Sequence, residues 1–91
     1  MKIKRVKVKD GLDKYTFYCL GCDEHHCINE SWSFNGDYDK PTISPSIAVQ
    51  GVGTTGSKKK CHSFIVGGKI EYLSDCTHRL KGQTVDLPNI N

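Results

Sequence analysis

Two cysteines separated by two residues, Cys19 and Cys22, constrain this chain more than any other feature of its sequence. They follow an alternating stretch, and Gly21 relaxes the backbone between them, so both thiols could bind one metal ion from a tight turn. A redox pair would require a helix within a βαβ pattern, which the sequence lacks. A chain of 91 residues has a thin margin of stability, to which a bound metal would add. The spacing therefore favours a zinc site.

Alternating polar and apolar residues predict antiparallel strands around this pair. Residues 5–9 and 14–19 form one expected hairpin, with a loop at 10–13 that pairs Val6 with Phe17 and turns Cys19 inward. Residues 35–46 read as a polar loop, because Pro41 and Pro45 interrupt regular structure, and 47–49 as a short strand. Residues 50–60 read as a mobile loop that is rich in glycine and then in lysine.

The clearest hairpin turns at Gly67-Gly68, which pairs Val66 with Lys69 and Ser63 with Tyr72. Because side chains alternate along a strand, an extension of this register places Cys61, Cys76 and His78 on one face and turns His62 to the other. No segment shows a convincing helical period. The sequence thus predicts a single all-β or β-dominated domain over residues 1–91, built from antiparallel hairpins with long loops.

A closed zinc site needs four protein ligands, and the register nominates the two cysteines that converge on the first pair. The expected Zn²⁺ ligands are Cys19, Cys22, Cys61 and Cys76. Alternative or supporting positions around the metal are His26, His62, Asp75 and His78. Asp75 is expected to cap a turn or to hold a neighbouring imidazole by a hydrogen bond. Cys27 is interpreted as a small buried apolar residue outside the site.

Two other functions stay open at this point. If only three residues bind the metal, a bound water could act in hydrolysis, with Asp75 or His78 as the base. Alternatively, the basic N-terminal strand and Lys58, Lys59 and Lys60 could contact nucleic acid, although a net charge of +3 is weak support. The G-x-G-x-x-G pattern at residues 51–56 leads into lysines and a strand, so it does not indicate a dinucleotide site.

Several short motifs occur together in order: C-x-x-C-x-x-x-H at 19–26, W-S-F-N-G-D at 32–37, K-P-T-I-S-P-S at 40–46, C-H-S-F at 61–64 and D-C-T-H at 75–78. In this combination the chain resembles a family of small uncharacterised proteins encoded by bacteriophages and prophages. The resemblance implies phage origin and metal binding.

We therefore expect a module without enzymatic activity that binds a host or phage protein, or less favourably nucleic acid. We expect it to act in the host cytoplasm. No apolar run of residues is long enough to span a membrane.

Overall fold

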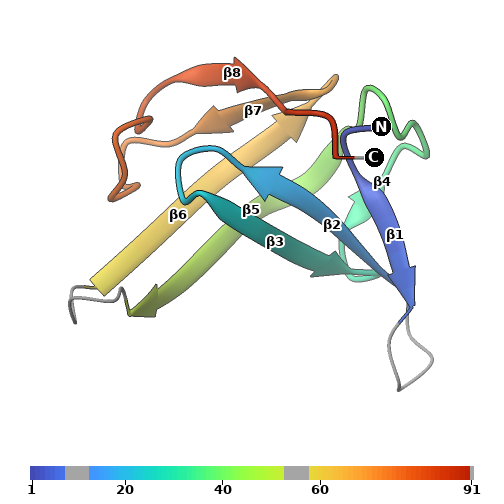
Figure 1. Ribbon diagram of the computed structural model, residues 1–91, viewed down its shortest axis with the longest axis horizontal. Coiled ribbons are helices and arrows are strands. Elements are labelled where there is room, and N and C mark those ends of the chain that lie inside the picture. Colours follow the sequence, from blue (N-terminus) through green and yellow to red (C-terminus); the bar gives the residue numbers. More distant parts are fainter. Residues whose placement is uncertain (8–12, 53–57, 91) are drawn as a thin grey trace.

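The computed structural model describes residues 1–7, 13–52 and 58–90. Two antiparallel sheets make up the fold (Figure 1), one with strand order β1-β2-β3 and one with order β4-β5-β6-β7-β8. The predicted β fold with antiparallel hairpins is confirmed. Within these ranges no helix is long and apolar enough to cross a membrane. The strands are β1 (Lys4–Lys7), β2 (Asp13–Cys19), β3 (Glu24–Asn29), β4 (Ser33–Phe34), β5 (Ile43–Val52), β6 (Lys58–Val66), β7 (Lys69–Tyr72) and β8 (Thr84–Asp86).

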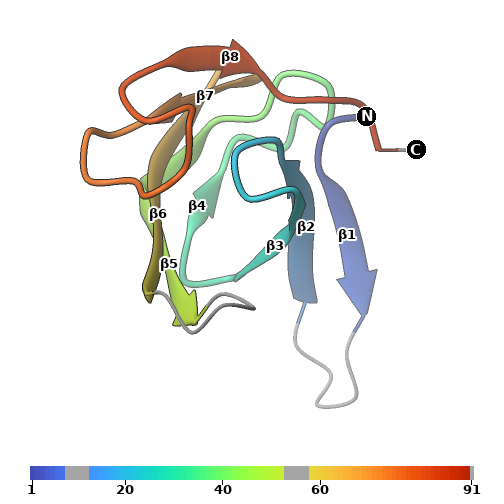
Figure 2. The same cartoon turned by 60° about the vertical axis from the view of Figure 1, so that its left-hand side comes forward.

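The core lies between the two sheets, which stand side by side in Figure 2. From Cys61 on, every second residue of β6 is buried, whereas the residues between them, His62, Phe64 and Val66, face away from the core. Each fully buried isoleucine or phenylalanine contributes about 1.5–3 kcal/mol by leaving water. The largest apolar side chains that are almost completely buried are Ile3, Phe17, Ile28, Ile43, Ile47, Ile65, Ile70, Tyr72 and Leu87.

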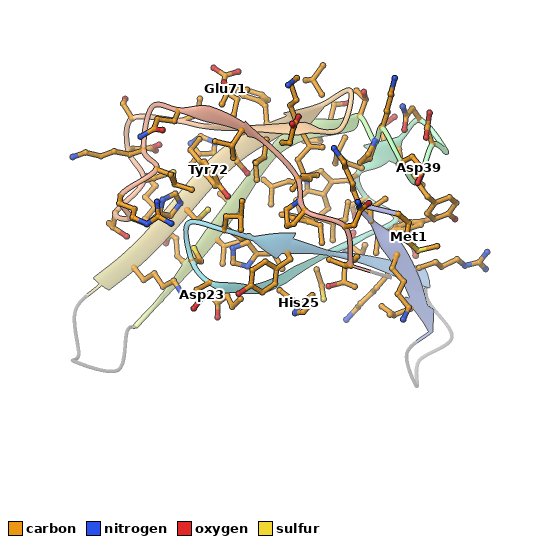
Figure 3. All side chains as sticks on the ribbon, turned by 45° about the horizontal axis from the view of Figure 1, so that its top comes forward. Met1, Asp23, His25, Asp39, Glu71 and Tyr72 are labelled. Atoms are coloured by element: carbon orange, nitrogen blue, oxygen red, sulfur yellow. The ribbon has the colours of Figure 1, made fainter. Side chains whose placement is uncertain are left out.

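The hairpin of β6 and β7 has the register that the sequence predicted. Val66 pairs with Lys69 and Ser63 pairs with Tyr72 across the two-residue turn. Figure 3 shows the consequence for two neighbouring residues of β7, since Tyr72 points between the sheets and Glu71 points away from them. The turn therefore fixes which β6 residues enter the core.

The register predicted for the first hairpin is wrong. Val6 pairs with Lys14, and not with Phe17, because the pairing of β1 with β2 is shifted by three residues along β2. Ile3 is fully buried, so it contributes the apolar side chain that the sequence had assigned to Val6. Cys19 does point inward, as predicted. Most of the predicted loop, residues 10–12, lies outside the described residues.

The strand β5 is longer than predicted, and it begins before Pro45. Between the pairs Ile43/Ile65 and Ile47/Ser63, three residues of β5 face a single residue of β6, so the strand bulges outward. A bulge is a place where a strand tolerates proline, because the ladder hydrogen bonds are already interrupted there. Both ends of the expected loop at 50–60 are also strand, since residues 50–52 pair with residues 58–60; residues 53–57 are not described.

Candidate active site and metal centre

A serine, a histidine and an aspartate form one hydrogen-bonded chain on the outer face of the five-stranded sheet. The Oγ of Ser46 lies 3.0 Å from Nε2 of His62, and Nδ1 of His62 lies 3.1 Å from Oδ2 of Asp75. One imidazole thus bridges a hydroxyl and a carboxylate through its two nitrogens. This is the arrangement in which a serine hydroxyl is activated for nucleophilic attack.

Three local structures bring these side chains together. His62 points outward from β6, opposite Ala48 of β5. Ser46 lies in the β5 bulge, next to this pair. Asp75 follows the end of β7, where the chain runs on beside β6, and the amide of Leu73 donates to the carbonyl oxygen of His62 at 2.9 Å. The bulge and the segment after β7 therefore place one partner on either side of the imidazole.

Asp75 is held by a lysine as well as by the histidine. The Nζ of Lys60 lies 3.0 Å from the same Oδ2 that contacts His62. The hydrogen bond from Lys60, reinforced by the one from His62, holds the pKa of the Asp75 carboxyl below its usual range. Asp75 is therefore ionised at neutral pH and can orient the imidazole.

Trp32 contacts the backbone of the serine in this chain. Its indole N–H donates to the carbonyl oxygen of Ser46 at 3.3 Å. Trp32 immediately precedes β4, which pairs with the start of β5 through Ser33 and Ser44. The position of Ser46 is thus supported from the β4 side of the bulge.

A second cluster lies on the opposite, buried side of β6. The thiols of Cys19, Cys22 and Cys61 and the imidazole of His78 have ligand atoms within 4.8 Å of one another, so they could hold a metal ion. The sulfurs of Cys19 and Cys61 are 3.8 Å apart, and Nε2 of His78 is 3.5 Å from the Cys61 sulfur. The amide of Cys22 donates to the Cys19 sulfur at 3.3 Å. In Figure 2 the β2–β3 turn, which carries the first two cysteines, lies close to the β7–β8 connection, which carries His78.

Gly21 allows the histidine to approach this turn. A Cβ at Gly21 would lie 2.2 Å from Cε1 of His78 and 2.4 Å from each of its ring nitrogens. The His78 ring also meets Tyr72 edge to face, with centroids 4.5 Å apart. The imidazole therefore lies in a cradle that only glycine leaves open.

Contacts among the thiols move their pKa values in opposite directions. Hydrogen bonding from Cys61 lowers the pKa of Cys19, and the same contact raises the pKa of Cys61. Burial raises the pKa of Cys22, and burial lowers the pKa of His78, which keeps the imidazole neutral. A second or third thiolate is unfavourable beside the first, and a bound cation would remove that cost.

Cys76, which the sequence nominated as the fourth ligand, lies apart from this cluster, and His78 joins the three cysteines in its place. The Cys76 sulfur accepts a hydrogen bond from the amide of His62 and donates to the carbonyl oxygen of the same residue, both at 3.2 Å. The predicted alternation of faces does not hold here, because the chain leaves the β7 ladder after Tyr72 and turns, with the amide of Cys76 donating to Leu73.

The remaining predicted positions have other surroundings. His26 is buried and packs edge-on against Phe17, and it forms a second three-residue group with Cys22 and Glu24. His62 faces away from the metal cluster, as predicted. Asp75 holds the His62 imidazole, which was one of the two roles expected for it. The expected burial of Cys27 is wrong, because strand alternation turns it outward between the buried His26 and Ile28. Cys27 does lie outside both groups.

The lysines of the basic segment are engaged by carboxylates where the structure describes their side chains. Lys59 pairs with Glu24, and Lys60 pairs with Asp75. The side chain of Lys58 lies outside the described residues. This arrangement gives no support to a nucleic-acid surface at residues 58–60.

Ser46 is a site residue that the sequence did not predict. It belongs to the motif at residues 40–46, but serine is common in loops and nothing adjacent marks it as reactive. A usable signal was the outward position of His62 together with an aspartate expected to hold an imidazole. A nearby hydroxyl would complete such a pair as a serine–histidine–aspartate triad.

A family model described as "Bacterial ubiquitination-like system serine protease (BubE)" matches residues 2–73. The matched range includes Ser46 and His62 and ends two residues before Asp75. No curated protein and no solved structure matched the chain.

This match overturns three expectations. The resemblance to a bacteriophage and prophage family is wrong, because the matched range contains most of the motifs that suggested it. The expectation of a binding module without catalytic activity is wrong for a family of proteases, and so is the expectation that the protein is not an enzyme. The chain belongs to the BubE family, the serine proteases of bacterial ubiquitination-like systems.

Proposed function

We propose that this chain is a serine peptidase in which Ser46 is the nucleophile, His62 the general base and Asp75 the group that orients the imidazole. The observation that carries the proposal is the continuous contact from Ser46 through both nitrogens of His62 to Asp75, at 3.0 and 3.1 Å. Such triads recur on unrelated folds in different chain orders, so geometry identifies them better than sequence order does. Membership of a serine protease family supports the same assignment.

The ionised Asp75 implies where each proton lies in the proposed mechanism. The Asp75 carboxylate accepts from the Nδ1–H of His62, which leaves Nε2 as the acceptor for the Ser46 hydroxyl. As Oγ attacks a substrate carbonyl carbon, its proton passes to Nε2, and Asp75 stabilises the imidazolium. Nε2 then returns the proton to the leaving amine, and an acyl-enzyme on Ser46 remains. Water then attacks the acyl carbon while Nε2 accepts its proton, and return of that proton to Ser46 releases the acid product and regenerates the serine.

The substrate that we propose is a polypeptide of a bacterial ubiquitination-like system, following the description of the family. Two exposed apolar side chains, Phe64 and Val66, alternate with buried residues on β6 and share the outer face with His62. Exposed apolar surface next to a reactive group favours contact with a substrate chain. We therefore expect the polypeptide to lie across this face beside Ser46.

We further propose that the second cluster holds a structural Zn²⁺. Two thiolates bound at about 2.3 Å on corners of a tetrahedron lie about 3.8 Å apart, and a thiolate and an imidazole nitrogen lie about 3.6 Å apart. The corresponding separations here are 3.8 Å for Cys19 and Cys61, and 3.5 Å for Cys61 and His78. These two pairs of donors are already spaced for zinc. All five cysteines are free thiols, which suits a reducing cytoplasm.

Four protein donors would complete the coordination of zinc and leave no position for a reacting water. We therefore assign bond cleavage to the serine, and not to a metal-bound water as one of the alternatives from the sequence had it. When bound, the zinc would supply a crosslink between the β2–β3 turn and the five-stranded sheet.

The catalytic assignment is tested with a fluorophosphonate, which reacts with activated serines, followed by mass spectrometry of the labelled peptide. Wild-type protein should be labelled on Ser46, and Ser46→Ala should not be labelled. The matched control is Ser44→Ala, which removes an exposed hydroxyl two residues away. Labelling of Ser46→Ala at the wild-type rate would refute the assignment.

The zinc assignment is tested by metal analysis of protein purified without added zinc. We expect about one zinc per chain, and a loss of the metal in Cys19→Ser or Cys22→Ser. The Cys27→Ser variant should keep the metal, since Cys27 lies outside the cluster. Fully folded protein without any bound metal would contradict the proposal.

A further inference from the structure

Two segments of the chain each serve both sites. On β6, Cys61 faces the metal centre and its neighbour His62 faces the triad. In the connection after β7, His78 belongs to the metal centre and Asp75, three residues earlier, belongs to the triad. A displacement of either segment would therefore change the geometry of both sites.

Cys76 and Thr77 join these two segments to each other. The Cys76 thiol, which is 4% exposed, accepts from the amide and donates to the carbonyl oxygen of His62, at 3.2 Å each. The Thr77 hydroxyl makes the same pair of contacts with Lys60, at 3.0 Å from its amide nitrogen and 3.2 Å from its carbonyl oxygen. The backbone amide of Thr77 also donates to the Lys60 carbonyl oxygen at 2.9 Å. Both residues thus clamp the β6 backbone beside His62.

This clamp is needed because the Asp75 side chain has little else to hold it. The β7 ladder ends at Tyr72, and the Asp75 side chain is 41% exposed. Among the described residues its carboxylate contacts His62 and Lys60, and both come from the strand that the clamp holds. An exposed carboxylate on an unclamped turn would spend much of its time away from the imidazole, since exposed ion pairs contribute little.

We propose that Cys76 is a positioning residue for catalysis: its buried thiol fixes Asp75 against His62, while His78, held in the metal centre, anchors the far end of the same turn. This inference rests on the proposed serine peptidase function. Cys76 is the one cysteine of the chain that is neither exposed nor in the metal cluster. The role proposed for it is one that a small apolar residue could not fill. A thiol that donates its proton to a carbonyl oxygen is not a metal ligand, which agrees with the position of Cys76 outside the cluster.

The test compares Cys76→Ala with Cys27→Ala, a control that removes an exposed thiol outside both sites. In Cys76→Ala the four metal donors remain, so zinc content should stay at the wild-type level. We expect the rate of fluorophosphonate labelling and kcat for a peptide substrate to fall at least tenfold, with KM within about twofold of the wild-type value. Cys27→Ala should match the wild type in all three measurements.

Two further measurements separate positioning from general stability. The proton that His62 donates to Asp75 should give a downfield NMR signal in the wild type, and this signal should disappear in Cys76→Ala while the zinc stays bound. Cys76→Ser, whose hydroxyl can make both contacts with His62, should restore the signal and most of the labelling rate. An unchanged signal and labelling rate in Cys76→Ala would overturn the inference.

Thr77→Val provides a second variant in case Cys76→Ala folds poorly, because Thr77 is exposed and its replacement removes the two hydroxyl contacts with Lys60 while the backbone contact stays. We expect severalfold slower labelling and a weaker downfield signal; wild-type behaviour of a folded Thr77→Val would overturn the inference. Ser46→Ala is measured in parallel. If Ser46→Ala still reacts, the proposed function itself fails. If Ser46→Ala is inert while the clamp variants behave as wild type, only the inference about Cys76 fails.

Discussion

Replacing Gly21 with alanine should release the metal through a single methyl group. The new Cβ would lie 2.2 Å from Cε1 of His78, and ordinary contact begins at 3.4 Å, so the ring would have to retreat by 3.4 − 2.2 = 1.2 Å. Tyr72 packs against the ring, and the amide of Leu80 holds the ring by donating to its Nδ1 at 3.2 Å. Metal–ligand distances tolerate displacements of only about 0.2 Å, so the imidazole should be lost as a ligand.

The expected loss of zinc affinity follows from the contribution of one ligand to the binding free energy. Structural zinc sites bind with about 10–16 kcal/mol, so one ligand of four corresponds to about 2.5–4 kcal/mol, or about a hundredfold to a thousandfold in affinity. Competition with a chromogenic chelator measures this change directly. The control is Gly51→Ala, whose added Cβ would meet nothing within 4 Å. Zinc affinity in Gly21→Ala within about tenfold of the wild-type value would refute the reasoning.

Three further predictions concern the catalytic side of the sheet. His62→Ala should lower kcat by about 10⁶-fold and Asp75→Asn by about 10⁴-fold, as measured by single-turnover kinetics; a loss below tenfold in either variant would contradict the triad. The pKa of Asp75 is lowered, so its stabilising contacts are complete above the unfolded-state pKa and are lost as the pH falls through the folded-state pKa. In an NMR titration of the carboxyl carbon, the midpoint should lie below that of an ordinary aspartate and should rise in Lys60→Ala; an unchanged midpoint would argue against the ion pair. Trp32→Phe removes the indole hydrogen bond to the Ser46 carbonyl. One hydrogen bond contributes about 1 kcal/mol, so kcat should fall by about fivefold. An unchanged kcat would show that the bulge keeps its shape without this bond.

The fold was predictable from the sequence where a short turn fixes the register. The two-residue turn at Gly67-Gly68 leaves one way to pair β6 with β7, so the positions of Ser63 and Tyr72 followed from it. The first hairpin has a longer loop, and the alternation of its strands fits more than one register. Burial of Ile3 selects among them, and that burial depends on the second sheet.

The candidate sites were predictable only in part, for a related reason. Three of the four residues in the metal cluster, Cys19, Cys22 and Cys61, followed from spacing and strand alternation. The fourth, His78, did not follow, because the expected strand alternation was extended past Tyr72. The chain turns there, so His78 lies in the cluster in place of Cys76. Ser46 could not be found from local pattern, since it meets His62 only through a bulge that forms when β5 pairs with β6.

The alternation of Cys61 and His62 on β6 makes this strand sensitive to changes in length. Side chains repeat every second residue, so one residue inserted between His62 and Ser63, with the β6–β7 turn keeping its register, would exchange the faces of Cys61 and His62. The thiol would then face outward, and the imidazole would take the inward position of Cys61. A single insertion there would therefore disable both sites at once, whereas a substitution of Cys61 or His62 would remove a side chain from one site.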